Sequence, residues 1–96
     1  MKALVTAIAL LVSFGARSAT VDCNNVAEFA EVIMEARQVG VSMPKAIELA
    51  NGSKLLEKII VDAYEVPHYS TQEYRSRKIL DFRDSWYLAC FKAMSE

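Results

Sequence analysis

The sequence predicts an all-α protein: a small four-helix domain whose first and last helices run antiparallel and are linked by a disulfide. Three observations predict this fold. Downstream of residue 23, apolar residues recur at helical spacing, and no segment has the alternation of a strand. The breaks between the periodic segments coincide with residues that cap or stop helices. The chain holds two cysteines, which permit one intramolecular bridge.

The N-terminal residues have the layout of a secretory signal peptide. Lys2 precedes an apolar stretch, residues 3–14, which Gly15 and small residues follow. A membrane-spanning helix needs about 20 apolar residues, so we expect no stable membrane anchor once the signal is removed. Small residues favour cleavage after Ser18, with cleavage after Ala19 as the second choice. We expect a signal peptide at residues 1–18 and a single helical domain at residues 19–96, located in the periplasm or secreted; a buried N-terminal helix of the domain is the alternative.

The first predicted helix begins at Asn24 or Asn25, since either residue suits an N-cap. Gly40 supplies the left-handed stop that helices favour. Arg37 is expected to point away from the apolar stripe. The residues that form this stripe are Val26, Phe29, Ala30, Ile33 and Met34.

Two shorter helices are expected next. Ser42 can cap the first of them, with Pro44 in its opening turn, and residues 51–52 end it. Ser53 can cap the second, in which apolar residues lie on one face and charged residues on the other. Val66 precedes a proline, which disfavours helical backbone there and closes the element.

The fourth predicted helix is the longest and runs from about Thr71 to about Ala93. Ser70 and Glu73 have the spacing of a capping box at its start. Its apolar residues are expected to form one broad buried face. They are Ile79, Phe82, Trp86, Ala89, Cys90 and Ala93, widened by Tyr87, Phe91 and Met94.

The two cysteines constrain the topology, because bridged cysteines keep their Cα atoms within about 7 Å. A bond between Cys23 and Cys90 brings the start of the first helix beside the end of the fourth, so these helices run antiparallel. Closing so long a loop contributes about 4 kcal/mol in the chain-entropy model. The competing interpretations are a redox pair, which would be a local C-x-x-C motif, and a zinc site, which would need four ligands.

The charge balance argues against nucleic acid as a partner. Removing the signal takes away Lys2 and Arg17 but no acidic residue, which leaves nine basic and twelve acidic side chains and a net charge of −3. Nucleic-acid-binding proteins carry clustered lysine and arginine. The one basic cluster here, at residues 75–78, lies among acidic residues.

No catalytic constellation stands out, so we expect a protein that is not an enzyme and has no catalytic residues, metal ligands or cofactors. His68 is the single histidine and lacks a nearby nucleophile in sequence, so an exposed turn residue is the favoured interpretation. Asp81 and Asp84 could share a helix face as paired carboxylates do, but ordinary surface charges are the favoured interpretation. Asn51 begins a glycosylation acceptor that also fits a helix stop followed by a new cap.

One segment is richer in tyrosine and arginine than packing requires. Both residue types are common at the energetic centres of protein interfaces, so we expect any protein partner to bind here. The favoured alternative is that Tyr64 and Tyr74 seal the edge of the core while His68 and Tyr69 form an exposed turn. The candidate partner-binding residues are Tyr64, His68, Tyr69, Tyr74, Arg75 and Arg77.

Four features of the sequence stand out together: the early Cys23 and the strings E-A-R-Q-V-G (35–40), Y-S-T-Q-E-Y (69–74) and D-F-R-D-S-W-Y-L-A-C (81–90). In these features the mature chain resembles a group of small exported helical proteins of unknown function from Gram-negative bacteria and their phages. It implies a periplasmic setting and a phage or prophage gene, and it transfers no active site. The expected function is a protein-interaction module of the inhibitor, immunity or phage accessory type. The alternative is an acid or stress chaperone of the periplasm.

Overall fold

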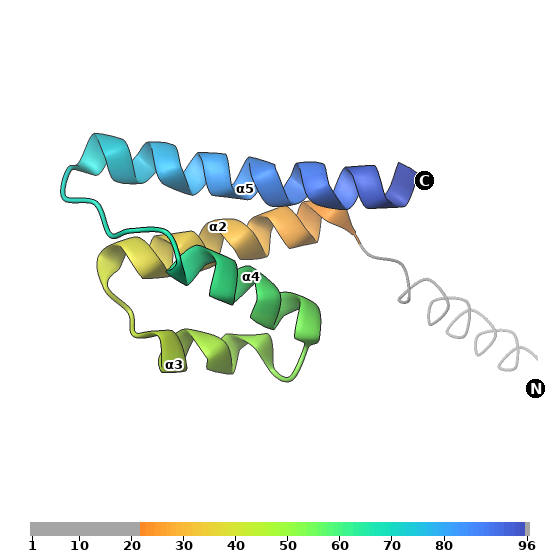
Figure 1. Ribbon diagram of the computed structural model, residues 1–96, viewed down its shortest axis with the longest axis horizontal. Coiled ribbons are helices and arrows are strands. Elements are labelled where there is room, and N and C mark those ends of the chain that lie inside the picture. The colour runs from red at the N-terminus through yellow and green to blue at the C-terminus, as the bar shows by residue number, and fades with distance from the viewer. Residues whose placement is uncertain (1–21, 96) are drawn as a thin grey trace, which may run out of the picture.

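Four α-helices and one 3₁₀ turn make up residues 22–95, the part of the chain that the computed structural model describes (Figure 1). They are α2 (Cys23–Val39), α3 (Met43–Ile47), η1 (Glu48–Ala50), α4 (Lys54–Tyr64) and α5 (Gln72–Ser95). No strand occurs within this range, so the predicted all-α class is confirmed. The predicted signal peptide, residues 1–18, lies outside the described residues.

The two longest helices, α2 and α5, pack against each other in opposite directions (Figure 1). Cys23, the first residue of α2, is bonded to Cys90 near the end of α5, and their Cα atoms lie 5.6 Å apart. The predicted disulfide and the antiparallel arrangement of the first and last helices are therefore confirmed.

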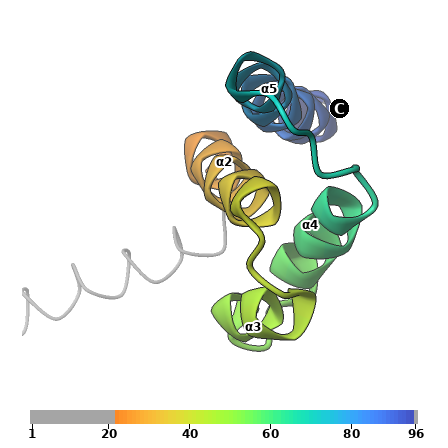
Figure 2. The same cartoon turned by 90° about the vertical axis from the view of Figure 1, so that its left-hand side faces the viewer.

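Helix α2 is the centre of the fold. Viewed along the helices, α5 lies on one side of α2, while α3 and α4 lie on the other (Figure 2). The core forms where these elements meet, and α5 contributes only one buried side chain, Phe82. The other buried core residues are Val26, Ala30, Ile33, Met34, Ala46, Ala50, Ile59, Ile60 and Ala63.

The helix ends follow the predicted chemistry with two shifts. Gly40 has a left-handed φ of 94°, and the Ser53 hydroxyl accepts a hydrogen bond from the Leu56 amide at 3.2 Å, as expected. The N-cap of α2 lies two or three residues earlier than predicted, because Asp22, and not Asn24 or Asn25, caps the helix. At the start of α5, Thr71 accepts the hydrogen bond from the Tyr74 amide at 3.2 Å, in place of the expected box begun by Ser70.

The broad buried face expected on α5 is narrower than predicted. Tyr87, Phe91 and Met94 are 39%, 56% and 51% exposed, whereas Ile79 and Trp86 pack against the core. The reason is that α5 has a helical neighbour on one side only (Figure 2). Helical spacing groups residues on one face, but it does not say how wide a sector the neighbour covers.

Candidate functional site

The loop between α4 and α5 is held by two adjacent side chains at the end of α2. Arg37 donates from Nε to the Val66 carbonyl oxygen at 2.8 Å. Gln38 donates from Nε2 to the Pro67 carbonyl oxygen at 2.9 Å, and its Oε1 accepts from the Tyr69 amide, also at 2.9 Å. Arg37 therefore points toward the loop and not away from the core, contrary to expectation. The loop within the candidate binding segment is therefore held to α2 by hydrogen bonds.

Gln38 is the buried polar residue of this arrangement, with only 1% of its surface exposed. A buried amide is costly unless its donors and acceptor are used. The loop uses both ends of it, and Nε2 also lies 3.6 Å from the Met34 sulfur. The Gln38 side chain therefore satisfies two backbone groups of the loop, the Pro67 carbonyl and the Tyr69 amide.

Tyr64 is a structural residue. Its hydroxyl donates to the Val41 carbonyl oxygen at 2.7 Å and so joins the end of α4 to the connection between α2 and α3. The Arg37 guanidinium lies 5.2 Å from the centroid of the Tyr64 ring. Burial raises the pKa of Tyr64 above its usual 10.0, and the nearby Arg37 charge offsets part of that rise. These contacts agree with the alternative in which Tyr64 seals the edge of the core.

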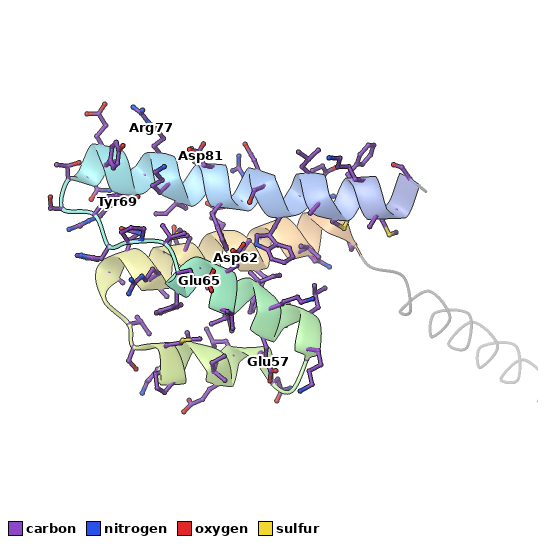
Figure 3. All side chains as sticks on the ribbon, in the orientation of Figure 1. Glu57, Asp62, Glu65, Tyr69, Arg77 and Asp81 are labelled. Atoms are coloured by element: carbon purple, nitrogen blue, oxygen red, sulfur yellow. A yellow bond between two sulfur atoms is a disulfide. The ribbon has the colours of Figure 1, made fainter. Side chains whose placement is uncertain are left out.

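Two other predicted tyrosines meet at the start of α5. The rings of Tyr69 and Tyr74 contact edge to face, with centroids 4.8 Å apart. The Lys78 ammonium lies 5.8 Å from the first ring centroid and 5.6 Å from the second, within the range of cation–π attraction. Arg77 lies 5.9 Å from the Tyr74 centroid and 3.7 Å from a Glu73 carboxylate oxygen. Figure 3 places Tyr69 and Arg77 near the end of α5 that adjoins the loop.

Arg75 is directed at the loop backbone, where it holds Tyr69 in place. Its Nε donates to the Tyr69 carbonyl oxygen at 2.7 Å, and an Nη atom lies 3.5 Å from the Ser70 carbonyl oxygen. The side chain is half-buried, whereas Tyr74 and Arg77 are exposed. His68 is also exposed and follows directly after the carbonyl that Gln38 holds.

The structure thus brings four of the six predicted residues together and adds a fifth. We call this surface the basic-aromatic patch, and it consists of Tyr69, Tyr74, Arg75, Arg77 and Lys78. Lys78 was not among the predicted binding residues. Its spacing of four from Tyr74 could have identified it, since residues four apart are neighbours on a helix. Tyr64 lies outside the patch, and His68 stands on the adjoining loop.

A shallow hollow of about 400 Å³ adjoins the patch between the loop and α5. Met34 and Phe82 contribute apolar surface to it, while Glu65, Lys78 and Asp81 contribute charge. The hollow is lined by Lys78, one of the three basic side chains of the patch, and by two carboxylates, so it provides contacts of both signs. Within residues 22–95 no three histidine, cysteine or acidic side chains lie close enough together to hold a metal ion.

A second hollow, of about 240 Å³, lies at the other end of α5 beside the disulfide. Its lining is almost wholly apolar, and Val26, Leu55 and Trp86 contribute most of its large side chains. Trp86 donates from Nε1 to Asp62 at 2.9 Å and so connects α5 to α4 close by. None of the described helices combines the length and the apolar character that crossing a membrane requires.

Comparison with known proteins finds no family model, no curated protein and no solved structure that matches the chain. The resemblance to small exported phage and bacterial proteins therefore stays a prediction.

Proposed function

We propose that the chain is an exported protein-interaction module, without catalytic activity, that sequesters one protein partner through the basic-aromatic patch. The observation that carries the proposal is the patch itself: Tyr74 and Arg77 are exposed on a loop and helix start that α2 holds in place. Preorganised tyrosine and arginine lose little conformational entropy on binding.

The charge of the patch suggests what the partner presents. Arg77 and Lys78 give this end of α5 a positive character, although the mature chain has a net charge of −3. A partner surface with exposed carboxylates beside an apolar contact would complement both the cations and the tyrosine rings. Such a stable, small and preorganised module suits an inhibitor, an immunity protein or a phage accessory protein.

Export is part of the proposal and rests on the signal-peptide pattern of residues 1–18, with the disulfide as support. Disulfides persist in oxidising compartments such as the periplasm, and the bond between Cys23 and Cys90 is compatible with such a location. Mass spectrometry of the protein from a periplasmic extract should give an N-terminus at Ala19 or Thr20. An uncut N-terminus with free thiols would contradict export.

The binding proposal is tested by capture of partners from periplasmic extract with three versions of the protein. The wild type should retain a specific protein, and Arg77→Glu combined with Tyr74→Ala should lose it. Lys45→Glu is the matched control, because it reverses one exposed charge on α3, far from the patch in sequence. A partner retained equally by all three versions, or the absence of any specific partner, would refute the role of the patch.

An acid-activated chaperone remains the second candidate, favoured by two carboxylate contacts that join helices. Asp62 accepts the Trp86 hydrogen bond between α4 and α5, and Glu31 of α2 lies 3.8 Å from Arg83 of α5. Protonation would weaken both contacts and loosen α5. This function predicts suppression of client aggregation at pH 2 to 3, and failure to suppress it would eliminate the candidate.

A further inference from the structure

Helix α5 has a second apolar stripe that the fold leaves uncovered. Leu80, Tyr87, Phe91 and Met94 are 44%, 39%, 56% and 51% exposed, although residues on the inner side of the same helix pack against the core. Among the helices of residues 22–95, Figure 2 shows none beside the outer side of α5. We call these four residues the outer stripe.

The spacing of the outer stripe is that of a helix-pairing seam. With Asp84 included, its positions are separated by four, three, four and three residues, which is the alternation that lets two helices pack along their length. The stripe covers about 21 Å of helix. The rings of Tyr87 and Phe91 stack at 6.3 Å between centroids with a 13° angle between planes, so the centre of the seam is a preformed flat aromatic surface.

We propose that the outer stripe is the interface between two copies of this chain, whose α5 helices pack antiparallel. Tyr87 lies midway between Leu80 and Met94 in the sequence. A two-fold axis at Tyr87 therefore pairs the two tyrosines with each other and pairs Leu80 of each copy with Met94 of the other. Leu80 and Met94 are similar in size, and the same operation places Phe91 of each copy opposite Arg83 of the other.

Charges beside the stripe favour the antiparallel second copy. Asp81 lies six residues before Tyr87, and Lys92 lies five residues after it, on the same flank of the helix. Antiparallel pairing brings this flank of both copies to the same side of the dimer, so that Asp81 of each copy lies on the side of Lys92 of the other, whereas parallel pairing places the two flanks on opposite sides of the dimer, apart from each other. Among the salt bridges of residues 22–95, none involves either side chain.

The exposed area sets the strength of this dimer. Large apolar residues present roughly 200 Å² each when fully exposed, so the outer stripe together with Leu88, which is 54% exposed, offers roughly 490 Å² per copy. A standard stable interface takes about 800 Å² per partner. We therefore expect a weak dimer, which forms at high local concentration.

The first test is sedimentation velocity on the oxidised protein from about 1 to 500 µM. The wild type should pass from monomer to dimer across this range, and Phe91→Glu should stay monomeric throughout. Leu49→Glu is the matched control, because Leu49 is 54% exposed but lies on η1, away from α5. Circular dichroism checks that each variant keeps its helices. A wild type that stays monomeric, or a dimer that Phe91→Glu does not affect, would overturn the proposal.

The second test addresses the orientation of the helices. Asp81→Lys places two like-charge pairs in the antiparallel dimer and should weaken it about tenfold, as should Lys92→Asp. The double variant exchanges the two charges and should restore the dissociation constant to within about threefold of the wild type. If neither single variant weakens the dimer, or if the double variant is weaker than either, antiparallel pairing is wrong.

Discussion

Replacing Gln38 should loosen the segment that carries half of the candidate site. In Gln38→Leu the side chain keeps its size but loses both polar ends. The Pro67 carbonyl then loses a donor, and the Tyr69 amide loses its acceptor. The Arg37 bond to Val66 remains as the attachment between α2 and the loop.

The magnitude follows from the burial of these bonds. An intramolecular hydrogen bond contributes about 1 kcal/mol net, and a buried group left without its partner costs more. Gln38 is 1% exposed, while the loop atoms are reached partly by water, so we expect a total loss of about 2 kcal/mol. A domain of this size is stable by only about 4–11 kcal/mol. The variant should therefore fold but unfold at clearly lower urea concentration.

Urea unfolding and hydrogen exchange together separate this effect from a general loss of packing. The Tyr69 amide should exchange faster by more than the global destabilisation accounts for, because its acceptor is gone. Gln72→Leu is the matched control, since Gln72 is exposed and bonds only to Ser76 on its own helix. A Gln38→Leu variant within about 0.5 kcal/mol of the wild type, or with unchanged exchange at Tyr69, would refute the clamp.

The charge of the clamp can be tested with Gln38→Glu. The carboxylate keeps an acceptor for Tyr69 but has no proton to donate to Pro67, and burial raises the pKa of an introduced carboxyl above its usual value of about 4.3. The protonated form, which can donate, is then favoured in the folded state. The variant should match the wild type most closely below about pH 4 and lose stability relative to it as pH rises through the folded pKa. A difference that is constant from pH 4 to 7 would contradict this.

Three further sets of substitutions test the other contacts that join the helices. Tyr64→Phe should lower the free energy of unfolding in urea by about 1 kcal/mol, because it removes one hydrogen bond. Burial raises the pKa of Tyr64, so the stabilising contribution of the tyrosine is complete below pH 10.0 and falls as pH rises through the folded pKa. The phenylalanine variant should lack this decline. Cys23→Ser with Cys90→Ser opens a 67-residue loop and should cost about 4 kcal/mol, measured by thermal unfolding, with less than 1 kcal/mol contradicting the entropic account. Trp86→Phe and Asp62→Ala should each cost about 1 kcal/mol, and the double variant should cost no more than the larger single loss if the hydrogen bond between them is the cause.

Sequence periodicity predicted the helices because each one is an amphipathic segment with local start and stop signals. The expected disulfide then gave one long-range distance, which was enough to predict that the first and last helices run antiparallel. Cys23 and Cys90 are the only pair that could form an intramolecular bond, so no competing connectivity had to be weighed. Local signals and one forced contact were enough for the fold class.

The candidate site was predicted less well because its geometry depends on contacts across 29 to 31 residues. Nothing near Gln38 in the sequence indicates that its side-chain amide forms hydrogen bonds with the backbone of Pro67 and Tyr69. Tyr64 and Tyr74 looked alike as tyrosines near a loop, yet one bonds inward to Val41 and the other faces solvent. The residue type shows that a side chain could bind a partner, whereas its exposure depends on which helices pack beside it in the folded protein.

The patch and the outer stripe lie on the same rigid helix, so the two proposals together predict how partners would be arranged. Tyr74 lies 13 residues before Tyr87, which places the patch about 20 Å along α5 from the proposed two-fold axis. Antiparallel pairing then carries the two patches to opposite ends, about 40 Å apart, where two partners can bind without contact.

Light scattering at about 200 µM should therefore give complexes of two chains with two partners. Phe91→Glu should reduce these to one chain with one partner, and the affinity of each patch should stay unchanged. A change in intrinsic affinity on Phe91→Glu would mean that the outer stripe contacts the partner directly. A complex of two chains with one partner would mean that the patches converge on a single surface, which antiparallel α5 helices do not permit.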